Sequence, residues 1–160
     1  MRLSLICVGR LKAGPERELF VRYEKRFAQI GRQIGLSPLK LVELPESRSA
    51  QASARQNEEA RAILGKCPDG IQLILLDEHG TSLTSIKLAD FIGSRRDAGT
   101  SEICFVIGGP DGHGEAVRKT AKMVLGFGQM TLSHGLARVV LSEQLYRAST
   151  ILAGHPYHRE

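Results

Sequence analysis

The stretch EICFVIG, residues 102–108, decides the fold class because it is apolar at every position from Ile103 to Ile107. A strand with one solvated face alternates apolar and polar residues, whereas a strand covered on both faces forms a continuous apolar run. Similar runs begin at Leu3 (LSLICVG), Leu39 (LKLVEL), Ile71 (IQLILLD) and Gln129 (QMTL). The chain is therefore predicted to contain a sheet that is buried on both faces.

Stretches with helical patterning separate these apolar runs. Strands and helices thus alternate along the chain, which is typical of an α/β protein with a mainly parallel sheet and helices on both faces. No linker, repeat or low-complexity stretch divides the sequence, so residues 1–160 are predicted to form one domain. The predicted helices are Glu16–Gln33, Ser53–Leu64, Ser85–Arg96, Glu115–Leu125 and Leu136–Ala153.

Composition narrows the class of protein. The chain carries 22 lysines and arginines against 17 aspartates and glutamates, a formal net charge of +5, which is below the extreme of proteins held to nucleic acid by charge alone. Cys7, Cys67 and Cys104 are an odd number with no close pair, so neither a zinc knuckle nor a disulfide framework fits. The first apolar run is too short for a signal peptide or a membrane span. We expect a cytoplasmic protein with no membrane partner and no metal.

Ligands of open parallel sheets bind beyond the carboxyl ends of the strands, where loops lead into helices. The glycine loop that follows Ile107 invites a phosphate-binding interpretation, but Glu115 and Ala116 stand where a Walker loop needs lysine and serine or threonine. Asp111 would also place a negative charge where an anion would bind. We expect a ligand with neutral or positive groups, although a plain turn before a helix would explain this loop equally well. The three loops of interest are LLDEHG (75–80), VIGGPDGHG (106–114) and GFGQMTLSHG (126–135), the last with Ser133 as a predicted N-cap.

The sequence ends in HPYHRE, residues 155–160, an unusual concentration of reactive groups. Histidine side chains titrate close to neutral pH, tyrosine stacks on bases, and arginine holds phosphates or developing anions. A tail docked on the core as packing would explain the same residues. His155 and His158 have metal-ligand spacing, but no third or fourth ligand is placed by spacing. Ser133 beside His134 does not make a hydrolase triad, since G-x-S-x-G is absent.

The motifs VIGGPDG, TLSHGLARVVLSEQLYRA and HPYHRE together resemble the SPOUT class of knotted RNA methyltransferases, and within it the RlmH family. The resemblance extends over the whole chain in length and order of elements, with Asp111 where glutamate is common and Ser133 where proline is common. It implies a C-terminal trefoil knot, a homodimer, and S-adenosylmethionine as methyl donor. The implied reaction is methylation of N3 of a pseudouridine in 23S ribosomal RNA of the large subunit, on the assembled ribosome.

The resemblance also implies which residues act. We predict His158 and Arg159 as the catalytic and substrate-binding pair, with Tyr157 as a positioning group. Arg147 follows Glu143 by four residues and is expected to form a helix ion pair, whereas Arg138 has no such partner. Arg138 is therefore predicted to contact RNA. His155 of the tail is also predicted to contact RNA. The implied cofactor-binding residues are Leu76, Gly108, Phe127, Gly128, Gln129, Met130, Thr131 and Leu132.

The last predicted helix is apolar over more of its circumference than one core face needs. A twofold dimer would bury the excess and could bring each tail near the cofactor of the partner subunit. Two other functions fit the same features. One is another SPOUT enzyme acting on transfer RNA or a different ribosomal base, and the other is a non-catalytic ribosome-binding factor that uses the basic helices alone.

Overall fold

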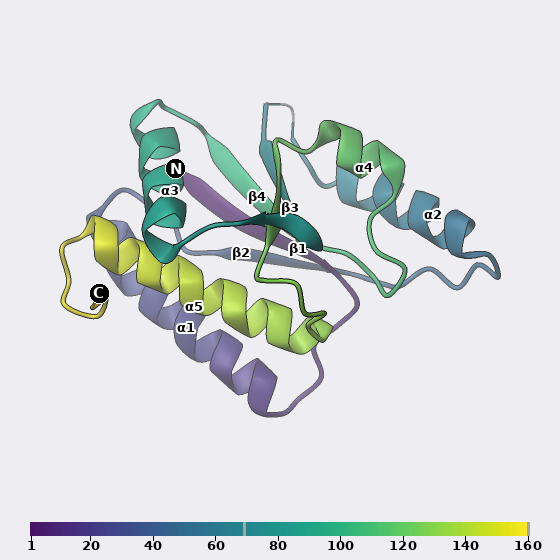
Figure 1. Ribbon diagram of the computed structural model, residues 1–160, viewed down its shortest axis with the longest axis horizontal. Helices are drawn as coiled ribbons and strands as arrows, with labels where there is room; N and C mark the ends of the chain where they lie inside the picture. The colour runs from purple at the N-terminus through teal and green to yellow at the C-terminus, as the bar shows by residue number, and fades with distance from the viewer. Residues whose placement is uncertain (69, 160) are drawn as a thin grey trace.

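The architecture comes from a computed structural model that describes residues 1–68 and 70–159. In these ranges the chain forms one sheet of five parallel strands in the order β2-β1-β4-β3-β5 (Figure 1). The strands are β1 (Arg2–Val8), β2 (Lys40–Leu44), β3 (Gln72–Ser82), β4 (Glu102–Ile107) and β5 (Met123–Gly126). The helices are α1 (Pro15–Gln33), α2 (Ala52–Leu64), α3 (Ser85–Asp97), α4 (Glu115–Thr120) and α5 (His134–Leu152). The predicted parallel α/β class is confirmed.

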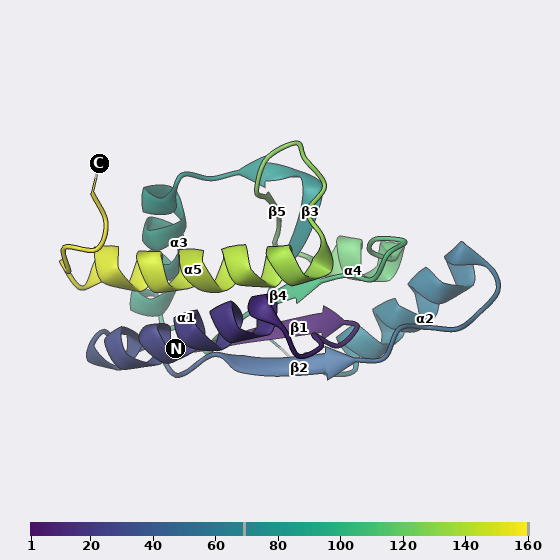
Figure 2. The ribbon, with the colours of Figure 1, turned by 90° about the horizontal axis from the view of Figure 1, so that it is seen from below.

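Helices cover both faces of the sheet, as Figures 1 and 2 show. Helices α1, α3 and α5 pack on one face, and α2 and α4 pack on the other. Alternate residues of β4 enter opposite cores: Phe105 and Ile107 pack beneath the first group of helices, and Cys104 and Val106 beneath the second. All six residues of β4 are buried, which explains why its sequence does not alternate.

The fifth strand is not where the sequence pattern put it. The predicted helix Glu115–Leu125 ends at Thr120, Ala121 adopts extended backbone, and β5 follows at Met123–Gly126. Val124 and Leu125 pair with β3 and fill the core beneath it. The predicted strand QMTL, residues 129–132, has no regular secondary structure. Pairing with a distant strand outweighed the local helical pattern.

Strand β3 is longer than expected, because the predicted loop 75–80 continues as strand to Ser82. Its pairing with β5 shifts in register between Leu76 and Thr81. A Cβ atom on Gly80 would lie 2.6 Å from the backbone carbon of Leu125, so only glycine allows this close approach. The irregular segment carries Asp77, Glu78 and His79 beyond the carboxyl edge of the sheet.

Helix α5 packs against both α1 and α3, with Leu141 and Leu145 in the core. Its predicted N-cap is confirmed, since Ser133 Oγ accepts a hydrogen bond from the Leu136 backbone N–H at 3.3 Å. Packing on two helices uses part of the apolar circumference that suggested a dimer. The trefoil knot implied by the resemblance concerns the threading of the chain and stays a prediction. In the described ranges, every helix is too short or too polar to span a membrane.

Candidate functional site

A cavity of about 550 Å³ opens at the carboxyl edge of the sheet, a volume within the usual range of small-molecule sites. The ends of β1, β3, β4 and β5 form its floor, and the loops that follow β4 and β5 form its walls. Since the strands are parallel, these ends meet at one edge, which is where ligands of such sheets bind. The cavity is therefore the candidate cofactor site.

The loop 108–112 after β4 is a tight turn in which the Gly112 N–H donates to the Gly109 carbonyl at 3.0 Å. A Cβ atom on Gly108 would lie 3.1 Å from two atoms of the His113 ring. On Gly109 it would lie 2.7 Å from Glu59 Oε2. Side chains at either position would displace the wall of the cavity, so the glycines serve close packing there.

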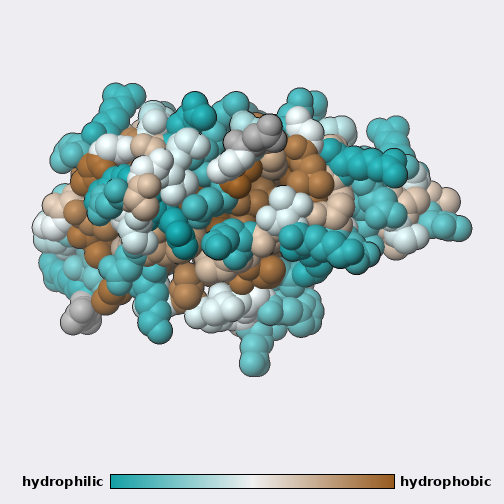
Figure 3. Space-filling view, turned by 90° about the horizontal axis from the view of Figure 1, so that it is seen from above, coloured by the Kyte–Doolittle hydropathy of each residue, from teal (hydrophilic) through white to brown (hydrophobic). Residues whose placement is uncertain are grey.

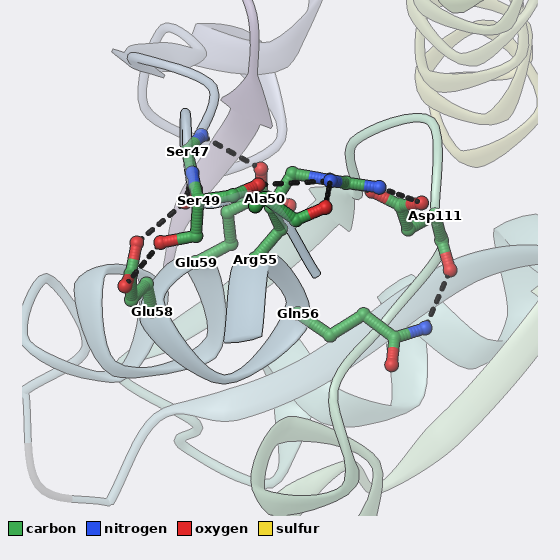
Figure 4. Close-up of polar contacts among 8 residues, drawn as sticks. All are labelled: Ser47, Ser49, Ala50, Arg55, Gln56, Glu58, Glu59 and Asp111. Carbon is green, nitrogen blue, oxygen red and sulfur yellow. Dashed lines mark hydrogen bonds and ion pairs between the residues drawn. The ribbon is translucent and has the colours of Figure 1, made fainter. Parts of the chain in front are cut away.

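Helix α2 holds this loop from outside through Asp111 (Figure 4). Arg55 Nε and Nη2 donate to the two carboxylate oxygens of Asp111 at 2.7 and 2.9 Å, and Gln56 Nε2 donates to its carbonyl at 2.6 Å. Arg55 also donates to the carbonyls of Ser49 and Ala50. The hydrogen bonds from Arg55 lower the pKa of Asp111. The charge of Asp111, expected to repel an anion directly, is thus paired with an arginine.

Other charged groups line the same cavity. Arg118 donates to Asp77 at 2.5 Å. Burial alone would raise the pKa of Asp77, but hydrogen bonds from the His79 backbone N–H and from Arg118 lower it. Thr131 donates its hydroxyl hydrogen to Glu78 and thereby links the loop after β5 to the extension of β3. Together with Glu46 and Asp111, these carboxylates make the cavity lining acidic overall, although the protein is basic.

Two histidines in the cavity wall form hydrogen bonds within the protein. His113 is 6% exposed, and its Nε2 lies 2.8 Å from the carbonyl oxygen of Leu76. His134, the first residue of α5, is half-buried and accepts a hydrogen bond at Nε2 from Arg138 Nε at 2.8 Å. Burial is the largest cause that lowers the pKa of each histidine.

The prediction that Arg138 contacts RNA is wrong. Its side chain is completely buried, and its guanidinium donates to Glu43, to the Gly9 carbonyl at 2.6 Å and to His134. Burial would raise the pKa of Glu43, but hydrogen bonds from the Leu11 backbone and from Arg138 lower it. Arg138 has no carboxylate partner on its own helix, because its ion-pair partner, Glu43, is on β2. The Arg147–Glu143 pair is confirmed, at 2.6 Å.

Most of the predicted cofactor-binding residues come together. Leu76 at the end of the regular part of β3 and Gly108 after β4 line the cavity from neighbouring strands. Gln129 lines an adjoining cavity with Glu78 and His79. Gly128, with φ of +122°, lies between the two cavities at a turn that glycine adopts easily. The remaining residues on the main cavity are Phe127, Met130, Thr131 and Leu132. Their contact with a cofactor stays a prediction.

Sequence reasoning missed His113, His134, Asp77 and Arg118 as cavity residues. All four lie in or next to the three loops singled out, which was the available signal. His134 was considered only as a neighbour of Ser133, and His113 only as part of a glycine loop. The contacts of His113 with Leu76 and of Arg118 with Asp77 join residues far apart in the sequence, which no local pattern shows.

The predicted catalytic residues lie at the other end of α5 from the cavity, as Figure 2 shows for the C-terminal tail. Among the described residues of the tail, none lines the cavity of its own protomer. His155 and Arg159 are exposed. In the described part of the tail, neither ring nitrogen of half-buried His158 has a hydrogen-bond partner. Glu160 lies outside the described residues.

Tyr157 anchors the tail to α5. Its ring packs against Tyr146 with centroids 4.6 Å apart, and the Arg147 guanidinium lies 4.8 Å from the centroid of the same ring. Its hydroxyl donates to Glu143 at 3.1 Å. Burial, the charge of the Glu143 carboxylate, the hydrogen bond to it and the neighbouring Tyr23 raise the pKa of Tyr157 to about 12. Tyr157 is therefore uncharged at neutral pH, and its role as a positioning group stays a prediction.

The chain is similar to several known proteins. The model of a family described as predicted SPOUT methyltransferases matches residues 1–158. A protein of Brucella anthropi named ribosomal RNA large subunit methyltransferase H is 52% identical over 99% of this chain and 99% of its own length. A protein of the same name from a Bradyrhizobium species is 50% identical over 99% of this chain and 98% of its own. The SpoU methyltransferase AviRb of Streptomyces viridochromogenes, solved with AdoMet, is 16% identical with a TM-score of 0.43 over 95% of this chain and 58% of its own.

Proposed function

The chain belongs to the SPOUT methyltransferase family, and on this premise we propose that it methylates ribosomal RNA of the large subunit with S-adenosylmethionine as methyl donor. The target atom is N3 of a pseudouridine in 23S rRNA, reached on the assembled ribosome. The chain acts as one catalytic domain in the cytoplasm, where ribosomes are found. The observation that carries the proposal is the cavity at the carboxyl edge of the sheet, which gathers Leu76, Gly108 and the loop after β5.

The residues around the cavity suit this cofactor. Its wall at Gly108 offers backbone groups to a nucleoside without a side chain in the way. Its lining carries the carboxylates of Glu46 and Glu78, which attract a ligand that bears a sulfonium and an ammonium group. The volume of about 550 Å³ is sufficient for a molecule of this size.

Methyl transfer depends mainly on alignment of the two reactants. When bound, S-adenosylmethionine supplies an electrophilic methyl group on a sulfonium sulfur. Methylation of N3 would require the proton on N3 to leave to a base. We assign the acceptance of this proton to His158 and the binding of the imide anion or a neighbouring phosphate to Arg159. Tyr157, held on Glu143 and Tyr146, places both groups.

These assignments require two protomers. The described residues of the tail do not line the cavity of their own protomer, so we infer that each active site combines the cavity of one protomer with the tail of its partner. A homodimer of this kind would also cover exposed apolar side chains. Met130 and Leu136, beside the cavity and at the start of α5, are 81% and 46% exposed. Figure 3 shows hydrophobic surface between hydrophilic regions on one face of the molecule.

The direct test is transfer of a labelled methyl group to intact ribosomes, to free 23S rRNA and to transfer RNA, followed by mapping of the modified base. We expect methylated pseudouridine in 23S rRNA, with intact ribosomes as the best substrate. Labelled transfer RNA, or a different ribosomal base, would establish another enzyme of the same class. Ribosome binding without cofactor binding by calorimetry would establish a non-catalytic ribosome-binding factor.

A further inference from the structure

One arginine of α2 joins two segments that lie far apart in the sequence. Nε and Nη2 of Arg55 donate to the two carboxylate oxygens of Asp111, and Nη1 donates to the carbonyls of Ser49 at 2.9 Å and Ala50 at 3.0 Å (Figure 4). A guanidinium carries its N–H groups in a rigid planar fork, so one edge can hold a carboxylate while the other end holds further acceptors. Arg55 thus fixes the segment before α2 against the glycine loop after β4.

Both of the joined segments contribute to the cavity. Residues 45–51, between β2 and α2, have no regular secondary structure and bring Glu46 to the cavity. The loop 108–112 brings Gly108 and Asp111 to it. In the sheet, β1 lies between β2 and β4, so these two described strands do not pair and do not fix the segments relative to each other. Arg55 supplies a direct link between them, although it does not itself line the cavity.

The segment before α2 also has a fastening of its own. Glu58 accepts hydrogen bonds from the hydroxyl of Ser47 at 2.5 Å and from the hydroxyl of Ser49 at 2.7 Å. Glu59 accepts a third one from the Ser47 backbone N–H at 3.0 Å. These contacts do not use the guanidinium of Arg55. They should therefore keep the segment on α2 when Arg55 is replaced.

The glycine loop likewise keeps a contact with α2 that is independent of Arg55, the hydrogen bond from Gln56 to the Asp111 carbonyl at 2.6 Å. The side chains of Arg55 and Asp111 are 28% and 23% exposed. An ion pair that water reaches contributes little to the stability of a fold. Loss of Arg55 should therefore leave the protein folded and remove mainly the link between the two segments.

We propose that Arg55 is a positioning residue for the cofactor site, which holds the segment 45–51 and the glycine loop at the separation that the cofactor needs. The proposal rests on the proposed function, because that function assigns the cavity to S-adenosylmethionine. Arg55 takes no part in methyl transfer itself. Walls that are held in place before binding lose less conformational freedom when the ligand binds, so Arg55 contributes to cofactor affinity.

Four variants and one control separate the parts of this link. Arg55→Met removes the guanidinium, whereas Arg55→Lys keeps the positive charge but has no planar fork to hold the carboxylate and both carbonyls together. Asp111→Asn removes the charge of the partner. The double variant of Arg55→Met with Asp111→Asn isolates the interaction of the pair, because Asp111 also lines the cavity and its charge can act on the ligand directly. Arg61→Met replaces an exposed arginine of the same helix and is the matched control.

The experiment measures the Kd of S-adenosylmethionine by calorimetry, its KM and kcat in methyl transfer to ribosomes, and the melting temperature without ligand. Arg55→Met should raise Kd and KM about 3- to 10-fold, with kcat at saturating cofactor within about twofold of the wild type. Its melting temperature should stay within about 4 °C of the wild type. Arg55→Lys should recover only part of the affinity. In the Asp111→Asn background, Arg55→Met should change Kd less than about twofold, since the pair is already broken. Arg61→Met should bind like the wild type.

An unchanged Kd in Arg55→Met, beside a wild type that binds the cofactor, would overturn the inference and leave the proposed function intact. An equal loss of affinity in the wild-type and Asp111→Asn backgrounds would also overturn it, because Arg55 would then act without its partner. Affinity that only follows melting temperature across the variants would show a purely structural role. If Arg55→Met does not fold, Arg55→Lys decides, and wild-type affinity in that variant would overturn the inference. Absence of cofactor binding by the wild type would instead contradict the proposed function, and this inference with it.

Discussion

Replacement of Arg138 by methionine removes a buried cation while keeping much of the volume of its side chain. The change leaves Glu43 without its ion-pair partner, the Gly9 carbonyl without a donor, and His134 Nε2 without its hydrogen bond. Arg138 is completely buried, whereas the side chain of Glu43 is 28% exposed, so water can partly solvate the carboxylate that remains.

Loss of one partner from a buried ion pair costs about 3–5 kcal/mol, and the partial exposure of Glu43 places the expected loss near 3 kcal/mol. For a domain of this length, 1 kcal/mol corresponds to roughly 2–4 °C in melting temperature. Arg138→Met should therefore melt about 6–12 °C below the wild type. The double variant Glu43→Gln with Arg138→Met should recover part of this loss, because no unpaired charge remains.

The assay is thermal and urea unfolding followed by circular dichroism, together with ribosome binding by the folded protein. Arg22→Met is the matched control, since Arg22 is an exposed arginine of α1 and should change the melting temperature little. An RNA contact through Arg138 would give the opposite pattern: a melting temperature within about 2 °C of the wild type, and weaker ribosome binding. That pattern would refute the structural account of Arg138.

Three further predictions follow from the site. S-adenosylmethionine at a hundred times its Kd should stabilise the wild type by about 2.7 kcal/mol and raise its melting temperature. Gly108→Val should abolish this rise, because its side chain meets the His113 ring. An equal rise in the variant would contradict the cofactor site. Deletion of residues 157–160 should leave folding and cofactor binding largely intact but reduce methyl transfer by roughly 10²- to 10⁴-fold, whereas a tail that only packs would lower the melting temperature and leave activity in proportion to folded protein. The pKa values of Glu43, Asp77 and Asp111 lie below their usual values of 4.5 and 3.8, so the stability they contribute is present at neutral pH and is lost as pH falls through and below these values. Acid unfolding of Arg138→Met should lack the part of this loss that comes from the Arg138–Glu43 pair, whereas the part from the Leu11 backbone N–H should remain. An unchanged acid limb would contradict the pairing.

The fold class could be predicted because a strand that is covered on both faces has a continuous apolar sequence, which can be recognised without knowing its partners. The run from Ile103 to Ile107 contains no polar residue, since helices cover both sides of β4. The boundaries of β5 could not be predicted in this way, because MVLG is only four residues long and follows a helical pattern directly. Its strand conformation depends on pairing with Leu75 and Leu76, about fifty residues away in the sequence.

The same distinction between local and distant partners explains the outcome for the site. Loops at the carboxyl ends of parallel strands pointed to the cavity, and the family resemblance pointed to part of its lining. Arg138 was misassigned because Glu43 and Gly9, which bury its charge, lie on other elements. Similarly, the hydrogen bond between His113 and the Leu76 carbonyl joins residues that only the folded chain brings together.

The central claim is that each active site takes its cavity from one protomer and its tail from the other, and subunit complementation tests it most directly. One protomer carries Gly108→Val, which should abolish cofactor binding because its side chain meets the His113 ring, and the other lacks residues 157–160. The two are produced together and methyl transfer to ribosomes is measured. Each variant alone should be inactive, whereas the mixed dimer should regain one complete site. Random pairing makes about half of the dimers mixed, so about a quarter of the wild-type activity should return. Mixed dimers that form and remain as inactive as their parents would contradict the shared site.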